Sequence, residues 1–515
     1  MRKDYRPVYH LSVEKGWSND PNGLIYFNGR YHMFFQHYPH EPQWGTMHWG
    51  HAVTDDFVKW EHLPVALVPD QDYEVICGCC SGSAIEKDGK MVLMYTAAQP
   101  TLQRQCLAVS EDGINFEKNS DNPVLTADML DEEVSPLDFR DPKVFEKDGR
   151  YYMVAGVRIL KKGMNPKSTS FSALNVTKDL PDVGDPVKSP SVLDVSQSDP
   201  DNEGLGNMIL CTSTDLVNWE YIGKMIIPGD GIEKGYFRLN GVYECPDYFE
   251  LDGTEVLLSS PQNLEAMGPL YQNIHSALYM TGRLDFESGR FEIEDASEID
   301  RGFDFYASQT MLTPDGRRIM VAWKEMWDRN YPTQDEGWAG TYVLPRELEI
   351  RDGRLFQHPV SEIENYRTEK VSHKSLLAEN EEFEVDGIEG ESIELSFTMD
   401  TEDSETCGVR LFFGKEHETL IYYDSRRECL VFNRENSGII LTGREINTKE
   451  RICPVKPGKI NLRIFLDVCS IEVFINGGEN VMTGNVYPDQ EDTGIRFFST
   501  GGSALFTDIV KYEIR

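Results

Sequence analysis

The hydrophobic positions of the chain fall in short runs of β-prone residues that two-residue turns join in pairs. Each pair is typical of a β-hairpin, because Asn-Gly and Asp-Gly favour the positive φ angles of a tight turn. Five hairpins are predicted, over Leu24–His37, Ala84–Tyr95, Val144–Val157, Tyr248–Leu258 and Met311–Trp323. Their turns are Asn28-Gly29, Asp88-Gly89, Asp148-Gly149, Asp252-Gly253 and Asp315-Gly316. Successive turns are about sixty residues apart, with one longer gap between the third and fourth, which indicates repeated structural units.

A second landmark lies in the latter half of three units, where one pattern of polar residues ends in an aromatic residue and Glu. It covers Thr54–Glu61, Ser110–Glu117 and Ser213–Glu220. Four strands in each of five units predict a five-bladed β-propeller. The extra residues of the third unit, at about 161–207, are rich in Ser, Pro, Asp, Asn and Gly, which is typical of a surface insertion.

From about residue 366 the pattern changes to short strands of alternating hydrophobic and polar residues, typical of an antiparallel β-sandwich. No long amphipathic helix is predicted anywhere. The sequence therefore predicts an all-β protein, with a five-bladed β-propeller over residues 1–352, a polar linker over 353–373 and an antiparallel β-sandwich over 374–515.

Composition narrows the range of partners. Lys and Arg number 50 against 87 Asp and Glu, a formal charge of −37 that repels phosphate backbones and anionic lipid. Neither a nucleic acid nor a membrane is therefore expected as a partner. The first residues lack a hydrophobic signal and no apolar run reaches 18 residues, so neither a signal peptide nor a membrane span is predicted.

The ten cysteines are typical of free thiols in a reducing cytosol, so a cytoplasmic location is expected. Cys77, Cys79 and Cys80 stand too close together for a disulfide framework. A metal site in this segment is the alternative, but no second Cys or His pair stands at ligand spacing. No metal and no cofactor are predicted.

Three acidic residues take nearly the same place in three of the repeated units. Asp20 and Asp141 each precede a proline, and Glu244 lies two residues before one. Each acid lies 7 or 8 residues ahead of the turn of its hairpin. Since the first strand of each propeller blade lines the central channel, we expect the three side chains to meet at one end of that channel.

Three clustered carboxyl groups, without a Ser-His-Asp order or metal-ligand spacing, favour cleavage of a glycosidic bond. That reaction needs one ionised carboxylate and one protonated carboxyl group on opposite sides of the acetal carbon. Neighbouring amides favour Asp20 as the anion, and apolar neighbours favour Glu244 as the acid. Arg140 is expected to keep Asp141 charged.

Trp17–Gly23, Phe139–Val144 and Tyr243–Phe249 together resemble the three acidic motifs of glycoside hydrolase family 32. This is the family of invertases, β-fructofuranosidases, sucrose-6-phosphate hydrolases, levanases and inulinases. Matching stretches continue in the family's order over about residues 7–350, and Leu462–Asn476 resembles its sandwich module. The resemblance implies a retaining hydrolase that releases terminal non-reducing β-D-fructofuranosyl units from sucrose and short fructo-oligosaccharides.

The resemblance also implies roles for individual residues of a catalytic propeller. Asp20 would be the nucleophile, Glu244 the acid/base and Asp141 the stabiliser of the transition state. The fructosyl site would be lined by Asn19, Gln36, Trp44, Ser81 and Arg140. The sequence departs from the family at Ser18 and Cys80, where Met and Phe are usual, which leaves the shape of the pocket open.

Several alternatives stand beside this reading. Within the family, sucrose-6-phosphate is the alternative substrate and fructosyl transfer the alternative reaction. From other classes, the chain could be a non-catalytic carbohydrate-binding propeller or a metal-dependent hydrolase.

Individual features have their own alternatives. Six histidines between His32 and His62 could bind zinc, but packing among strand aromatics is favoured; Trp44 and Trp49 could simply fill the core. The sandwich is expected to be structural or to support a homo-oligomer rather than to bind sugar. The insertion or the sandwich is expected to border the pocket and to limit the entry of longer fructans.

Overall fold

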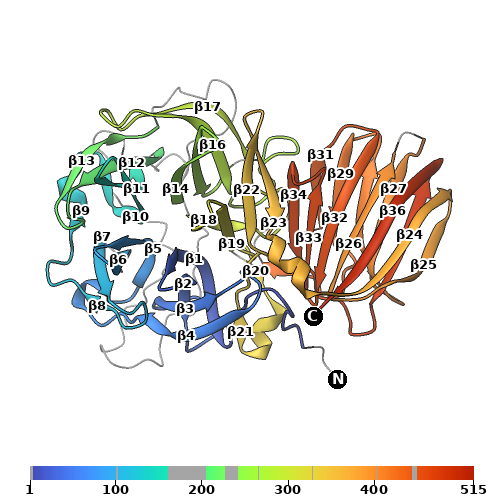
Figure 1. Cartoon of the computed structure of the whole chain (residues 1–515), viewed down its shortest axis with the longest axis horizontal. Coiled ribbons are helices and arrows are strands. Elements are labelled where there is room, and N and C mark those ends of the chain that lie inside the picture. The colour runs from blue at the N-terminus through green and yellow to red at the C-terminus, as the bar shows by residue number, and fades with distance from the viewer. Residues whose placement is uncertain are drawn as a thin grey trace.

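Five β-sheets stand in a ring, and a two-sheet β-sandwich packs against one side of it (Figure 1). The computed structural model describes residues 4–99, 102–160, 205–226, 242–264, 266–327, 329–401, 403–443 and 449–515. The predicted all-β fold, a five-bladed propeller followed by an antiparallel sandwich, is confirmed. Helix within these residues is confined to short 3-10 turns: η1 (Asp72–Glu74), η2 (Ala127–Met129), η3 (Pro332–Glu336) and η4 (Ser361–Tyr366). No helix in the described ranges is long and apolar enough to cross a membrane.

Each sheet of the ring is antiparallel, except where β21 joins the first. The first sheet contains β1 (Gly16–Phe27), β2 (Arg30–Tyr38), β3 (His48–Thr54), β4 (Trp60–Leu67) and β21 (Trp338–Ala339). The second contains β5 (Gly78–Lys87), β6 (Lys90–Gln99), β7 (Leu102–Ser110), β8 (Glu117–Lys118) and β9 (Leu125–Thr126). The third contains β10 (Val134–Lys147), β11 (Arg150–Ile159), β12 (Leu205–Ser213) and β13 (Trp219–Lys224). The fourth contains β14 (Tyr243–Leu251), β15 (Thr254–Pro261), β16 (Leu278–Leu284) and β17 (Phe291–Glu298), and the fifth β18 (Tyr306–Leu312), β19 (Arg318–Trp323), β22 (Arg346–Arg351) and β23 (Arg354–Pro359).

The predicted hairpin turns set the register of the first two strands in four blades. In the first four turns both central residues have positive φ, for example 48° at Asn28 and 87° at Gly29. Such a turn matches the twist of the strands that it joins. The fifth turn differs, because Thr313 and Arg317 close a longer loop around Asp315-Gly316, in which Gly316 takes φ 90°.

The first strands of the five blades contact one another in the order β1, β5, β10, β14 and β18, and β18 contacts β1 again. Each of these inner strands has a bulge of one extra residue at a corresponding place, and β1 and β10 each have a second irregularity elsewhere. The bulges lie between Ser18 and Pro21, Cys80 and Gly82, Arg140 and Lys143, Glu244 and Asp247, and Tyr306 and Gln309. A bulge bends the strand and turns a side chain away from the regular alternation. The ring thus presents five irregular positions at one height around its axis.

The ring is closed by pairing between its two ends. β21 runs parallel to the start of β1, with Gly16 opposite Trp338 and Trp17 opposite Ala339. Gly340 lies so close to β1 that a Cβ atom added there would come within 2.1 Å of Ser18 Oγ. The closure therefore lies next to the bulge that carries Asp20.

The sandwich consists of two six-stranded antiparallel sheets around one hydrophobic core. One sheet contains β24 (Arg367–Glu379), β36 (Ser503–Ile514), β26 (Ile393–Asp400), β32 (Lys459–Asp467), β33 (Ser470–Ile475) and β34 (Asn480–Asn485). The other contains β25 (Glu382–Glu389), β35 (Gly494–Thr500), β27 (Thr406–Phe413), β28 (Thr419–Asp424), β29 (Cys429–Asn433) and β31 (Glu450–Pro454). A two-stranded sheet of β20 (Arg329–Asn330) and β30 (Thr442–Gly443) connects the ring to the sandwich.

The segment 353–373, predicted as a linker, is structured. Its first part forms β23 of the fifth blade, and its last part belongs to β24 of the sandwich. β23 pairs with β22 across the tight turn Asp352-Gly353, which was not counted among the predicted hairpins. β24 is mostly polar and exposed because it lies at the edge of its sheet, so its sequence did not predict a strand. The insertion predicted at about 161–207 lies outside the described residues, except for 205–207, which belong to β12.

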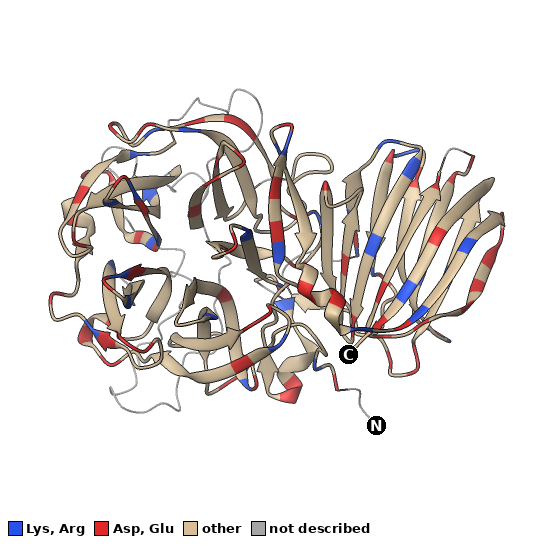
Figure 2. Cartoon of the chain, viewed as in Figure 1, with Lys and Arg blue, Asp and Glu red and all other residues tan. Residues whose placement is uncertain are grey.

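Buried charges hold the sandwich against the ring. Arg346 of β22 contacts Asp300 at 3.0 Å and, on the sandwich, Glu472 at 2.7 Å. His10 contacts both Asp467 at 2.8 Å and Glu472 at 2.9 Å. All five side chains are shielded from solvent, so removing one partner would leave a buried charge uncompensated. Elsewhere, acidic residues are distributed over both the ring and the sandwich (Figure 2).

Candidate active site

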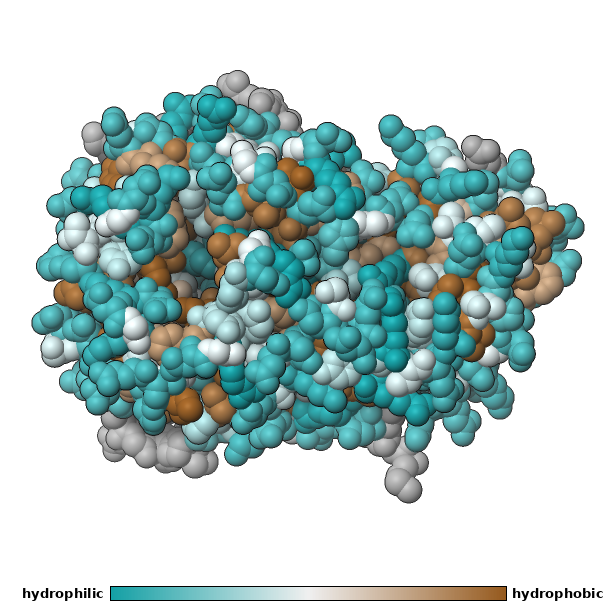
Figure 3. Space-filling model, viewed as in Figure 1, coloured by the Kyte–Doolittle hydropathy of each residue, from teal (hydrophilic) through white to brown (hydrophobic). Residues whose placement is uncertain are grey.

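The three acidic residues predicted from the repeats lie at the bulges of three inner strands, with Asp20 on β1, Asp141 on β10 and Glu244 on β14. The thiol of Cys245 lies between two of them, with Sγ 3.5 Å from Asp20 Oδ2 and 3.8 Å from Asp141 Oδ2. Arg140 links Asp141 and Glu244, because it donates to Glu244 and lies 4.0 Å from Asp141 Oδ2. The structure therefore brings the three carboxyl groups together, and the surface is hollowed over the middle of the ring (Figure 3).

Asp20 is held by its neighbours on β1 and β5. Asn19 Nδ2 donates to Asp20 Oδ1 at 2.9 Å, and Ser81 Oγ donates to Oδ2 at 2.6 Å. Trp17 Nε1 donates to Asn19 Oδ1 at 2.8 Å, which fixes the orientation of the amide. Burial, and next the charge of Glu244, raise the pKa of Asp20, while the hydrogen bonds from Ser81 and Asn19 lower it. Two of the residues predicted to line the site thus contact the predicted nucleophile.

Glu244 receives hydrogen bonds on both oxygens. Arg140 donates through Nε at 3.0 Å and Nη2 at 2.9 Å to Oε1, and Tyr306 Oη lies 2.6 Å from Oε2. Arg140 is itself buried and also donates to Asp138 at 3.1 Å. Its guanidinium is therefore directed at Glu244 more than at the adjacent Asp141.

Arg140 lowers the pKa of Asp141, as expected, but burial outweighs this influence. Burial is the largest influence and raises the pKa of Asp141 to about 7, against a lowering by Arg140 and with a further rise from Glu244. The backbone N–H of Cys245 donates to Asp141 Oδ2 at 3.0 Å, and the N–H of Asp141 donates to Thr96 Oγ1 at 3.0 Å. Asp141 itself takes the left-handed conformation, with φ 62°, inside this bulge.

Family models match almost the whole chain. The glycosyl hydrolases family 32 N-terminal domain matches residues 10–173 and 195–359, and the glycosyl hydrolases family 32 C terminal matches residues 362–513. The chain belongs to glycoside hydrolase family 32. The predicted family is confirmed, and with it a glycosidase that acts on β-fructosides.

Relatives within family 32 align over nearly their full length. A raffinose invertase of Escherichia coli is 34% identical over 98% of this chain and 94% of its own, and a sucrose-6-phosphate hydrolase of Escherichia coli is 33% identical over 97% and 93%. The solved structure of a mutant Bombyx mori GH32 β-fructofuranosidase in complex with sucrose is 30% identical. Its TM-score is 0.77, over 99% of this chain and 94% of the other.

Gln36 and Trp44 are the other residues that the family resemblance places in the fructosyl site. Gln36 is buried, and its Nε2 donates to the carbonyl of Cys79 at 3.0 Å. Trp44 is partly buried and packs against the hydrophobic cluster that contains Trp17, Cys245 and Tyr306. Trp49 is fully buried in the hydrophobic core between the first two blades. It therefore fills the core, as the alternative interpretation of this residue predicted.

The histidines and cysteines that could suggest zinc are packed among other side chains. His32 Nδ1 lies 3.0 Å from His51 Nε2, and burial lowers the pKa of these two rings to about 4 and about 3. Cys77, Cys79 and Cys80 are buried free thiols.

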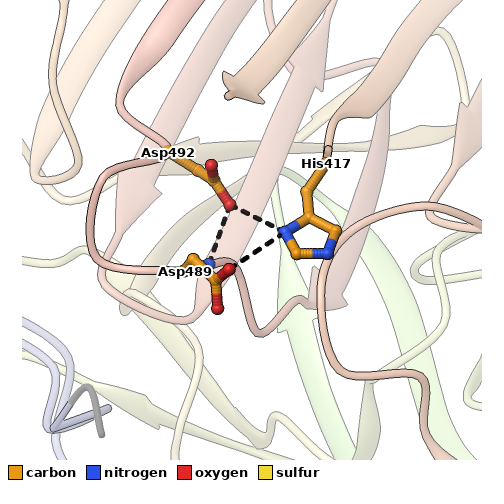
Figure 4. A group of neighbouring side chains, drawn as sticks. All are labelled: His417, Asp489 and Asp492. Atoms are coloured by element: carbon orange, nitrogen blue, oxygen red, sulfur yellow. Dashed lines mark hydrogen bonds and ion pairs between the residues drawn. The ribbon is translucent and has the colours of Figure 1, made fainter. Parts of the chain in front are cut away.

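Within the described part of the chain, the His, Cys and carboxylate group with metal-ligand spacing is His417, Asp489 and Asp492, which lies in the sandwich (Figure 4). His417 Nδ1 at 3.0 Å and the N–H of Asp489 at 2.9 Å both donate to Asp492 Oδ2. These hydrogen bonds join two loops of the sandwich and explain why the three side chains lie together.

Sequence reasoning missed Tyr306 and Asp138. Tyr306 lies in the stretch Asp304–Ala307, which matches the family but was given no role, and its hydroxyl is the second donor to Glu244. Asp138 is fully buried between Arg140 and Arg158. No pattern in one sequence distinguishes such a tyrosine from a core tyrosine, because the contact depends on the order of the blades in space.

Proposed function

We propose that this family 32 enzyme is a β-fructofuranosidase that releases the terminal fructosyl unit of sucrose and short fructo-oligosaccharides with retention at the anomeric carbon. The observation that carries the proposal is the meeting of Asp20, Asp141 and Glu244, which Cys245 and Arg140 contact in turn. The similarity to a β-fructofuranosidase solved with sucrose supports the substrate.

Asp20 is proposed as the nucleophile and Glu244 as the acid/base. In the first step an Asp20 oxygen bonds to the anomeric carbon while Glu244 gives its proton to the glycosidic oxygen, and glucose leaves. In the second step Glu244 takes a proton from water, and the water oxygen displaces Asp20. Ser81 and Asn19 hold the Asp20 carboxylate in place for attack.

Asp141 is proposed to bind sugar hydroxyls and to stabilise the positive charge of the transition state. In the free site its pKa of about 7 leaves a proton on the cluster at neutral pH, because closely spaced buried carboxyl groups titrate together. Sugar hydroxyls that donate to Asp141 favour its ionised form, so the proton becomes available to Glu244 as the substrate binds.

Replacing each acid by its amide tests these roles. Asp20→Asn is expected to lower the release of fructose from sucrose by several orders of magnitude while binding is retained. The same chemical change at Asp88→Asn, in the turn of the second blade, serves as the matched control and should keep full activity. Unchanged release by Asp20→Asn would remove Asp20 from the nucleophile role, and retained sugar binding without any hydrolysis by the parent enzyme would favour the carbohydrate-binding alternative.

Sucrose-6-phosphate is the second candidate substrate, favoured by the 33% identical relative of that name. Against it, the arginines described at the site already pair with acids, Arg140 with Asp138 and Glu244, and Arg158 with Asp138. We propose sucrose as the substrate for this reason. Measuring kcat/KM side by side on sucrose and sucrose-6-phosphate decides between the two substrates. A preference of about tenfold or more for the phosphorylated sugar, or about 1.4 kcal/mol, would overturn the choice.

We also propose a cytoplasmic location, supported by ten cysteines that are all buried and form no disulfide bond with one another. A homo-oligomer built through the sandwich stays a prediction, which light scattering of the purified protein tests.

A further inference from the structure

The segment that leads into the fifth inner strand is bound to the sandwich along its length. The N–H of Arg301 donates to the Val481 carbonyl at 2.8 Å, and the N–H groups of Phe303 and Asp304 donate to the Thr483 carbonyl at 2.6 and 3.1 Å. Residues 301–304 of the propeller thus lie along β34, the edge strand of the sandwich. This contact is tight, because a Cβ atom added at Gly302 would lie 2.1 Å from the Thr483 backbone.

Asp304 is the anchor of this segment. It is fully buried, and its carboxylate is bonded by Arg329 and, from the sandwich, by Arg434 at 2.7 Å and the N–H of Asn485 at 2.7 Å. The Arg434 guanidinium also stacks 3.8 Å from the ring centre of Phe303. A charged pair enclosed in this way holds its partners in one geometry.

Two residues further on, Tyr306 opens β18 and reaches Glu244. Its Oη lies 2.6 Å from Glu244 Oε2 and 2.8 Å from the Ser260 carbonyl. Burial keeps the Tyr306 hydroxyl protonated, so one O–H serves two acceptors. When Glu244 is ionised, Tyr306 donates to it; when Glu244 carries a proton on Oε2, Glu244 donates to Tyr306 and Tyr306 donates to Ser260. Tyr306 can therefore support both states through which an acid/base group passes.

We infer that the sandwich takes part in catalysis, because Arg434 and β34 fix Asp304, and through it Tyr306, at the distance that orients Glu244. Arg434 and Tyr306 are positioning residues in this arrangement. The inference rests on the proposed role of Glu244 as the acid/base.

The test compares two substrates whose need for an acid differs. Sucrose needs protonation of its leaving oxygen, whereas β-D-fructofuranosyl fluoride leaves without it. Arg434→Met and Tyr306→Phe are expected to lower kcat/KM for sucrose about 10- to 100-fold and for the fluoride about threefold or less. In the double variant, kcat/KM for sucrose should fall no further than in Tyr306→Phe alone, because both changes act on the same contact. Arg434→Lys, which keeps the charge, should give a ratio of kcat/KM for sucrose to kcat/KM for the fluoride that lies between those of the parent and Arg434→Met. It replaces Arg434→Met in the test if Arg434→Met does not fold.

Tyr9→Phe is the matched control. It removes another buried contact between ring and sandwich, the 2.7 Å hydrogen bond to the Leu466 carbonyl. The ratio of kcat/KM for sucrose to kcat/KM for the fluoride should stay unchanged in this variant. The inference would be overturned if Arg434→Met or Arg434→Lys lowered kcat/KM equally for both substrates, or lowered it for neither. Glu244→Gln separates this failure from that of the proposed function: if it still hydrolyses sucrose at the parent rate, the acid/base assignment itself is wrong.

Discussion

At the scale of single residues, the chemistry depends on where burial places a proton. Asp20 and Asp141 both have raised pKa values, and burial is the largest cause for each. The local sequence suggested the opposite for both, since amides flank Asp20 and an arginine precedes Asp141. Neighbours in sequence could not predict the outcome, because the Arg140 guanidinium turns to Glu244, which is 104 residues away. The identities of the three acids were predictable from the repeat, but their protonation was not.

The pH dependence of kcat/KM for sucrose should reflect the shared proton of the free site. Above about pH 7, where Asp141 loses its proton, kcat/KM should fall about tenfold per pH unit. β-D-fructofuranosyl fluoride serves as the control, because its leaving group needs no acid and its alkaline decline should be absent or weak. A kcat/KM for sucrose that stays level up to about pH 9 would contradict the shared proton.

The raised pKa of Asp141 also makes a prediction for stability. A carboxyl group that holds its proton more tightly when folded stabilises the protein fully below its unfolded pKa, near 3.8, and this contribution is lost as the pH rises through about 7. At about pH 8 Asp141→Asn should therefore stabilise the fold by roughly 1–3 kcal/mol. At about pH 4 it should have little effect, and thermal unfolding at both pH values checks this. A loss of stability at about pH 8 would show that ionised Asp141 is satisfied by its neighbours.

At the scale of elements, bulges in the inner strands of a regular repeat bring together the acids of the proposed active site. Pro142 and Pro246 stand inside two of the bulges, where a residue without N–H loses no ladder hydrogen bond. The hairpins were predictable from Asn-Gly and Asp-Gly, whose conformational preference is local. The strand at 367–373 was not, because its partner β36 is distant in sequence. The strand at 354–359 pairs with the adjacent β22 across Asp352-Gly353, a turn of the same kind that was not counted among the predicted hairpins.

The closure of the ring should be sensitive to a single added carbon. Gly340→Ala would force a Cβ atom to within 2.1 Å of Ser18 Oγ, two residues from Asp20. Gly458→Ala is the matched control, since its φ of 123° is close to the 116° of Gly340 but open space surrounds it. Gly340→Ala should cost roughly 1–3 kcal/mol more than the control in denaturant unfolding and also lower kcat. Equal costs for the two variants would mean that β1 shifts freely at this contact.

At the scale of the whole molecule, the ring and the sandwich are expected to unfold as one unit, because fully buried charges such as Arg346 pair across their interface. All eight tryptophans lie before residue 339, so tryptophan emission reports on the ring alone, whereas calorimetry reports on both parts. The two transitions should coincide, and Arg346→Met should lower both together. A calorimetric transition without a change in tryptophan emission would show that the sandwich unfolds separately.

The proposed mechanism depends most on Asp20 forming a bond to the fructosyl unit while Glu244 acts from the other side. Glu244→Gln treated with β-D-fructofuranosyl fluoride tests this directly, because the first step needs no acid whereas the second lacks its base. Mass spectrometry of the quenched and digested protein should find one fructosyl unit on the peptide that contains Asp20. A fructosyl unit on another peptide, or complete turnover of the fluoride without any adduct, would contradict the account.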